Sequence, residues 1–317
     1  MYRSFCLIIP LVFHTAISSA QTITETFGTG ANAFSMDFVT IGNPGNSADT
    51  TGNPNPVGSV SYIYNMAKYE VSREMIEKAN SQGGLNISLQ DMSSNGGNGL
   101  LKPATGISWN EAARFVNWLN TSKGYQAAYN FASSGSNDNI SLWGSGQSSG
   151  SNLFRHKNAF YFLPSDDEWY KAAYGSPVGT WYNFPTGSDS VPTPVAGGTS
   201  PGTAVYLQPF NQGPADITNA GGLSLYGTMA QGGNVWELIE SAADLTNDDG
   251  SERRALRGSP WEHVDDGYLH PTTRFTPQAT DEYLNTGFRV ASVPEPSALS
   301  LLAVGLGGLA VMRRRRS

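Results

Sequence analysis

A glycine-rich turn followed directly by an amide, an indole and a carboxylate limits how the second half of this chain can pack. The turn reads Gly233-Asn234-Val235-Trp236-Glu237. Consecutive glycines at 232 and 233 allow positive φ angles or close approach to another group. One interpretation is a cation site at Gly233, Asn234, Val235 and Glu237, because calcium accepts mixed backbone and side-chain oxygens. The alternative is that Trp236 anchors a core and Glu237 pairs with a buried arginine.

The two ends of the chain differ in kind from the middle. Arg3 precedes an apolar run over residues 6–13, and Ser18-Ser19-Ala20 supplies small residues at cleavage positions. We therefore predict a secretory signal peptide over residues 1–20, with a buried first strand as the alternative.

At the other end, Val293-Pro294-Glu295-Pro296-Ser297 is followed by an apolar run over 298–312 and four arginines over 313–316. The run is shorter than the ~20 residues that cross a bilayer comfortably. Residues 293–317 resemble the PEP-CTERM sorting signal of bacteria, which implies recognition and removal by an exosortase-type enzyme after transient membrane contact. An ordinary tail anchor is the alternative. Both interpretations place the middle of the protein outside the cell, at the surface or in the extracellular space.

Charge and cysteine content exclude several classes of function. Without the two ends the chain has 14 Lys and Arg against 25 Asp and Glu, a net charge of −11. Nucleic acid is therefore not an expected partner, because phosphates require a basic footprint. The chain's single cysteine is Cys6, within the predicted signal peptide. The remainder has no thiol for a disulfide or a metal.

Local patterns predict three helices and several strands. Ser72 is placed to cap a helix that runs to about residue 80. Two further helices begin with capping-box spacing, Ser108 with Glu111 and Ser165 with Glu168. The acids at 166–168 are expected to serve that helix N-terminus. Strands are predicted over residues 34–41, 60–64, 69–71, 255–258 and 287–291.

Six motifs in order carry a family resemblance. The chain resembles the formylglycine-generating-enzyme, or sulfatase-modifying-factor, family at Lys68-Tyr69-Glu70-Val71-Ser72, Ile107-Ser108-Trp109-Asn110-Glu111-Ala112, Phe162-Leu163-Pro164-Ser165-Asp166-Asp167-Glu168-Trp169, Gly233-Asn234-Val235-Trp236-Glu237, Leu256-Arg257-Gly258-Ser259 and Gly287-Phe288-Arg289-Val290. The resemblance implies an α+β, C-type-lectin-like fold with much irregular structure. It places this domain over residues 21–292, with its core at about 60–292. It also implies structural calcium at the turn, bound by backbone carbonyls and Glu237.

The chain departs from the family where oxidase chemistry would lie. Family oxidases use a copper-binding cysteine pair shortly after an Arg-Gly-Gly-Ser motif, but here Arg257-Gly258-Ser259-Pro260-Trp261 follows. His263 falls near the first cysteine position and Tyr268 near the second. Neither is the thiolate that Cu(I) prefers, so copper is not expected.

Two hypotheses of function remain. The first is a non-catalytic surface or matrix module that binds a glycan or a peptide. Its cleft would be lined by Trp261, His263, Tyr268, Arg274 and Arg289, because aromatic faces and arginine forks suit such ligands. The second is a metal-dependent oxidoreductase of the same family that uses His263 as ligand or base. Arg257, Arg274 and Arg289 are also candidates to pair with Glu237 or Glu262.

Overall fold

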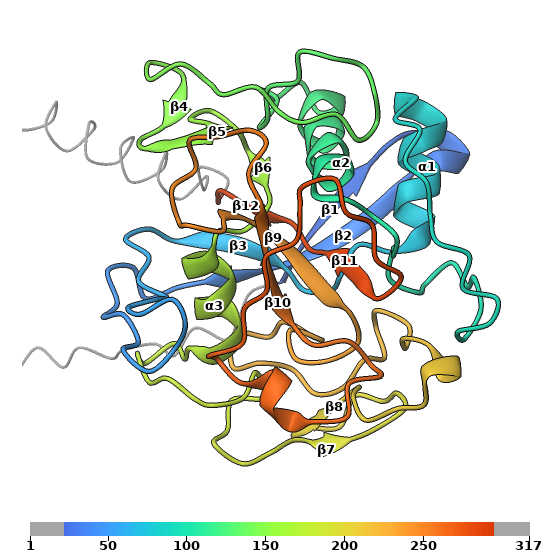
Figure 1. Cartoon of the computed structure of the whole chain (residues 1–317), viewed down its shortest axis with the longest axis vertical. Helices are drawn as coiled ribbons and strands as arrows, with labels where there is room; N and C mark the ends of the chain where they lie inside the picture. Colours follow the sequence, from blue (N-terminus) through green and yellow to red (C-terminus); the bar gives the residue numbers. More distant parts are fainter. Residues whose placement is uncertain (1–21, 295–317) are drawn as a thin grey trace, which may run out of the picture.

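The computed structural model describes residues 22–294, in which the larger sheet has five strands in the order β1-β2-β3-β12-β6 (Figure 1). Every neighbouring pair in it is antiparallel. The strands are β1 (Thr22–Phe27), β2 (Phe34–Ile41), β3 (Tyr64–Ala67), β6 (Tyr161–Phe162) and β12 (Ala291–Ser292). The predicted signal peptide and residues 295–317 of the predicted sorting tail lie outside the described residues.

A smaller sheet lies at the centre of the view in Figure 1. Its middle strand is β9 (Trp236–Ala242), which pairs antiparallel with β10 (Arg254–Gly258) and parallel with β11 (Thr286–Phe288). Four short strands form two further pairs: β4 (Ser148–Ser149) with β5 (Asn152–His156), and β7 (Thr193–Pro194) with β8 (Thr203–Ala204).

The helices begin at the predicted serines. They are α1 (Arg73–Gly83), α2 (Trp109–Ser122) and α3 (Asp166–Tyr174). The Ser72 side chain accepts a hydrogen bond from the N–H of Met75, and complete capping boxes precede α2 and α3. Helix α1 continues past its predicted end because Gly84, at φ 60°, supplies a left-handed cap. Short 3-10 turns occur at Gly30–Asn32, Phe210–Gln212 and Asp266–Leu269 (η3).

The strand predictions held for residues 34–41 and 255–258 and differed elsewhere. Residues 69–71 are not a strand, and only Tyr64 of the predicted 60–64 strand belongs to β3. The predicted last strand is divided between β11 and β12, because the chain crosses there from the smaller sheet to the larger one. Strand β1 pairs with β2, and β2 pairs with β3, so this sheet begins well before residue 60.

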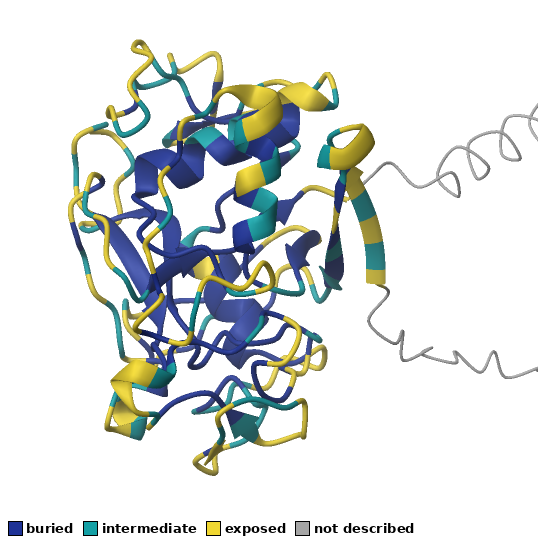
Figure 2. Ribbon diagram, turned by 90° about the vertical axis from the view of Figure 1, so that its right-hand side faces the viewer, coloured by how far each residue is buried: buried dark blue, intermediate teal, exposed yellow. Residues whose placement is uncertain are grey.

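The main core lies between α2 and the two sheets. Buried residues fill this interior, and exposed residues concentrate in the loops and on the solvent faces (Figure 2). Trp109 is fully buried and donates its indole N–H to the carbonyl of Ile239 on β9 at 2.9 Å. The mixture of helices and two sheets confirms the α+β prediction. No helix within residues 22–294 has the length and apolarity needed to span a bilayer.

A buried ion network joins α3 to β9. Arg155 Nη2 lies 3.0 Å from Glu168 Oε2 and 2.6 Å from Glu240 Oε2, and both carboxylates are fully buried. Tyr129 donates its hydroxyl to Glu240 at 2.9 Å. Burial alone would raise the pKa of Glu168, but the charge and hydrogen bonds of Arg155 hold it below its usual range. The network therefore depends on one guanidinium.

We expect Arg155→Met to lower the free energy of unfolding by about 3–5 kcal/mol, because it leaves two buried carboxylates without their cation. Denaturant unfolding followed by circular dichroism measures this. Lys157→Met is the control, since Lys157 is exposed two residues away and its removal should change stability by less than about 0.5 kcal/mol. Equal losses in the two variants would contradict the assigned role.

Candidate functional site

The glycine-rich turn passes against the backbone of residue 205. Gly233 has φ +100°, and a Cβ on it would lie 2.4 Å from the carbonyl oxygen of Val205. The next residue, Asn234, accepts a hydrogen bond from the N–H of Ala215 at 2.7 Å and donates one to Glu70 at 2.6 Å. The turn is therefore held by its own amide and tolerates no side chain at Gly233.

Glu237 is bound by an arginine and an indole. Arg289 Nε donates to Glu237 Oε2 at 2.6 Å, and Nη2 donates to Oε1. Trp169 donates its indole N–H to Oε2 at 2.6 Å. All three side chains are fully buried. The interpretation that Glu237 pairs with a buried arginine is confirmed, and of the three candidate arginines the partner is Arg289.

These hydrogen bonds use oxygen atoms that the calcium site expected at Gly233, Asn234, Val235 and Glu237 would need. A calcium ion requires free oxygen donors, and both carboxylate oxygens of Glu237 already accept N–H donors. The side-chain oxygen of Asn234 is also in use. The side chains of this turn therefore offer calcium no free carboxylate oxygen, because Arg289 already supplies a positive charge beside Glu237.

Trp236, between the turn and Glu237, borders a cavity of about 450 Å³. The cavity is built on the smaller sheet: Trp236 begins β9, Leu256 lies on β10 and Thr286 begins β11. Loops around η3 and before β11 complete it. The other lining residues are Arg253, His263, Tyr268, Phe275, Thr276, Pro277, Tyr283 and Asn285. We call this cavity the aromatic pocket.

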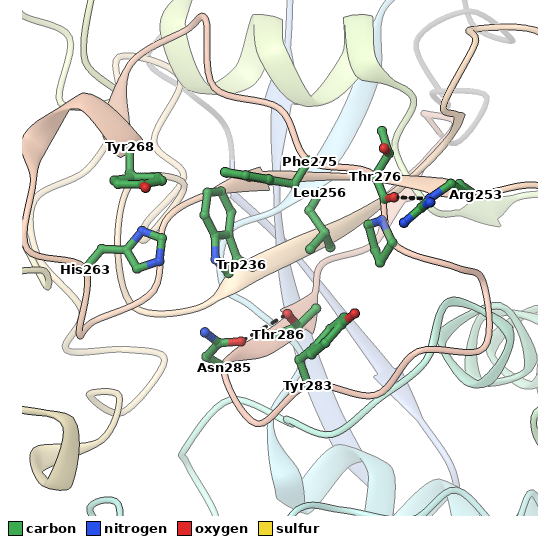
Figure 3. A pocket seen from close by; sticks show the side chains of 11 residues that line it. Trp236, Arg253, Leu256, His263, Tyr268, Phe275, Thr276, Tyr283, Asn285 and Thr286 are labelled. Carbon is green, nitrogen blue, oxygen red and sulfur yellow. Dashed lines mark hydrogen bonds between the residues drawn. The ribbon is translucent and has the colours of Figure 1, made fainter.

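The aromatic rings that line the aromatic pocket pack against one another. The ring centroids of His263 and Tyr268 lie 4.0 Å apart, and Trp236 lies 5.3 Å from His263 and 5.0 Å from Phe275. Trp236 and Leu256 lie between two groups of side chains, one containing Tyr268 and Phe275 and the other Tyr283 and Asn285 (Figure 3). Such mutual packing limits ring movement, so the pocket presents fixed aromatic surfaces.

His263 is the titratable imidazole of the aromatic pocket. It is half-buried, its Nδ1 has no hydrogen-bond partner within residues 22–294, and burial lowers its pKa. It is therefore neutral at neutral pH. His270 packs instead against Phe184, with centroids 5.2 Å apart, and Glu262 accepts a hydrogen bond from Asn285. Nowhere between residues 22 and 294 do three His, Cys, Asp or Glu side chains gather closely enough to hold a metal ion.

Of the five residues predicted to line the ligand cleft, the structure places His263 and Tyr268 in the aromatic pocket and the other three outside it. Trp261 is fully buried and donates its indole N–H to the carbonyl of Phe210. Arg274 donates to Asp166 at 2.9 Å and to two backbone carbonyls, while Arg289 is buried against Glu237. These side chains have internal partners, so they do not reach the pocket.

Most of the other lining residues are not among the residues predicted from the sequence. Trp236 was interpreted as a core anchor, and it is 5% exposed, yet it also borders the aromatic pocket. Phe275 and Tyr283 are 45% and 46% exposed and come from the loop before β11. Two large aromatic residues in a polar loop were the available signal, because such residues are enriched at binding surfaces.

Comparison with known proteins identifies two segments of the chain. The family described as "Sulfatase-modifying factor enzyme 1-like domain" matches residues 30–293, and the PEP-CTERM protein-sorting motif matches residues 292–316. No curated protein matches this chain closely in sequence.

Solved structures share the fold at low sequence identity. Treponema denticola variable protein 1 has a TM-score of 0.59 at 18% identity, covering 86% of this chain and 99% of its own. CarF has a TM-score of 0.57 at 16% identity, with 82% and 99% covered. PvdO from Pseudomonas aeruginosa has a TM-score of 0.52 at 14% identity, with 85% and 98% covered. These likenesses concern the fold alone.

Because partial burial favours the neutral form of His263 and lowers its pKa, protonation favours the unfolded chain. The unfolded pKa is about 6.5 and the folded pKa is lower, so this residue's contribution to stability is complete above about pH 6.5 and is lost as pH falls through the folded pKa. We expect the free energy of unfolding to fall less between pH 7 and pH 5 in His263→Gln than in the unsubstituted chain. Denaturant unfolding across this range measures it, and parallel pH profiles would contradict the buried neutral state.

Proposed function

This chain belongs to the family of sulfatase-modifying factor enzyme 1-like domains, and from that premise we propose that it is a non-catalytic binding or structural module. In this proposal the aromatic pocket is the cleft in which the domain binds an extracellular glycan or peptide. The sorting motif over residues 292–316 implies export, association with the cell surface and recognition by an exosortase-type sorting system.

The observation that carries the proposal is the aromatic pocket. It offers about 450 Å³ bordered by four aromatic side chains and a neutral histidine, with hydroxyl and amide groups from Thr276, Thr286 and Asn285. Aromatic faces bind the C–H face of a sugar or an apolar side chain, and the polar groups supply orientation. Two of the four aromatic residues are about half exposed, so ligand has access without rearrangement of the core.

The non-catalytic part of the proposal is supported by residue chemistry. The resemblance implies oxidase chemistry through a cysteine pair, and Cys6, the chain's single cysteine, lies outside the matched residues 30–293. At the corresponding positions the aromatic pocket contains His263 and Tyr268. An imidazole packed on a phenol provides no thiolate for Cu(I).

The alternative, a metal-dependent oxidoreductase using His263, stays a prediction. His263 does face the aromatic pocket with an unpaired Nδ1. Within residues 22–294 no group of three metal-ligating side chains includes it, His270 packs on Phe184, and one carboxylate oxygen of Glu262 accepts a hydrogen bond from Asn285. No specific observation therefore favours this alternative over a binding module.

Tyr268→Ala tests the pocket as a binding site. We expect it to weaken binding about tenfold or more, because truncating an aromatic anchor at an interface commonly costs upwards of ~1.4 kcal/mol. The full chain would be screened on an array of soluble polysaccharides and short peptides, and hits titrated by calorimetry. Tyr125→Ala is the matched control, since Tyr125 is half-buried outside the pocket and stacks on Phe160. Equal affinities in both variants would place the ligand elsewhere.

Thermal melting with and without EDTA tests whether the turn binds structural calcium. Because Arg289 already pairs with the Glu237 carboxylate, we expect EDTA to leave the midpoint of thermal unfolding unchanged. Metal analysis of the same protein, purified without chelator, is the companion measurement. Calcium near stoichiometry, together with a lower melting midpoint in EDTA, would show that the protein binds structural calcium. Copper or iron that disappears in His263→Ala would favour the oxidoreductase.

A further inference from the structure

We propose that the ligand of the aromatic pocket is an acidic polysaccharide, whose sugar ring lies on the aromatic side chains and whose carboxylate is bound by Arg253. This inference rests on the proposed function, because it takes the aromatic pocket as the binding site and adds the charge of its ligand. Arg253 is the pocket's single formally charged lining residue.

Arg253 is held in place but keeps most of its donors free. Its Nε donates to the carbonyl of Thr276 at 2.6 Å, which fixes the guanidinium at one end of the pocket (Figure 3). Within residues 22–294 its Nη groups donate to no protein acceptor, and no carboxylate lies within 4.0 Å of them. The residue is exposed. A guanidinium with free Nη donors binds a carboxylate in a two-pronged arrangement.

The other arginines around the smaller sheet behave differently. Arg257 and Arg274 both pair with Asp166, and Arg289 pairs with Glu237. Buried Arg254, which follows Arg253, packs over Trp109 with its Cζ 4.5 Å from the ring centroid. Arg254 also lacks a carboxylate partner within residues 22–294 but is buried, whereas Arg253 is exposed and oriented without one, which leaves its charge for a ligand.

Nearby acids do not cancel this charge by direct contact. Asp281 accepts hydrogen bonds from the Tyr283 hydroxyl at 3.0 Å and from the N–H of Gln278 at 2.9 Å, so its carboxylate stays with its own loop. His263 is neutral because burial lowers its pKa. The pocket is thus locally cationic on a chain with a net charge of −7. A cation placed in an acidic protein selects for anions at short range.

The remaining lining favours a sugar over a peptide as the bearer of the carboxylate. Aromatic surfaces at Trp236, Tyr268 and Phe275 suit the C–H face of a pyranose ring. Hydroxyl and amide groups at Thr276, Thr286 and Asn285 suit its hydroxyl groups. The outer edge of β10 at the pocket is already paired, because Leu256 exchanges backbone hydrogen bonds with Phe275, so a peptide backbone could not pair with it there.

The test compares charged sugars with their neutral counterparts. Calorimetry measures the binding of galacturonate, glucuronate and mannuronate oligosaccharides to the full chain. Each is compared with the same oligosaccharide after its carboxyl groups have been reduced to alcohols. We expect at least one charged member to bind about tenfold more tightly than its reduced form, as for a hydrogen bond to a charged group. Arg253→Gln should remove that preference, and Arg253→Lys should keep part of it.

Lys157→Gln is the matched control, because it removes one positive charge from an exposed position outside the pocket. It should leave the preference unchanged. Equal binding of charged and reduced sugars, or equal effects of Arg253→Gln and Lys157→Gln, would overturn the proposal. So would a poly-glutamate peptide that binds more tightly than every uronate. If sugars bind without regard to charge and Tyr268→Ala weakens them, the pocket is a ligand site and only the anionic inference fails.

Discussion

The ion pair between Glu237 and Arg289 lies where segments that are far apart in the sequence meet. Arg289 lies where the chain crosses from β11 to β12, and its guanidinium donates to Glu237 on β9 and to the carbonyls of Ala67, Lys68 and Met229. Both charges are fully buried. Removing either partner would leave an uncompensated charge in the interior, so the position of both sheets depends on the pair being complete.

Buried ion pairs also connect α3 to its neighbours. Its first turn contributes Asp166 to Arg257 and Arg274, while Glu168 contacts Arg155. Acidic residues that cap this helix thus also hold neighbouring strands. With Cys6 as the chain's single cysteine, the domain has no disulfide to limit its unfolded state. Buried ion pairs instead connect these segments in the folded state, and they engage the guanidinium groups of Arg155, Arg257, Arg274 and Arg289.

Local chemistry made the helices predictable, and long-range contacts made the site hard to predict. The serines at 72, 108 and 165 cap through residues three positions away, so their function is legible in the sequence. The binding partner of an arginine cannot be identified from the sequence in the same way. Whether Arg253, Arg274 or Arg289 meets a carboxylate or solvent depends on residues up to 222 positions distant, such as Ala67. His263 and Tyr268 were found because the family motifs aligned their positions. Phe275 and Tyr283 lie outside those motifs.

Strand β12 has a mechanical consequence. It lies between β3 and β6, and the sorting motif begins at its second residue, Ser292. Any pull on the chain beyond this point enters the domain at an internal strand of the larger sheet and not at an edge strand. Antiparallel partners on both sides place the hydrogen bonds across the direction of pull, so they are loaded together in shear. The attachment point is thereby held by two neighbouring strands at once.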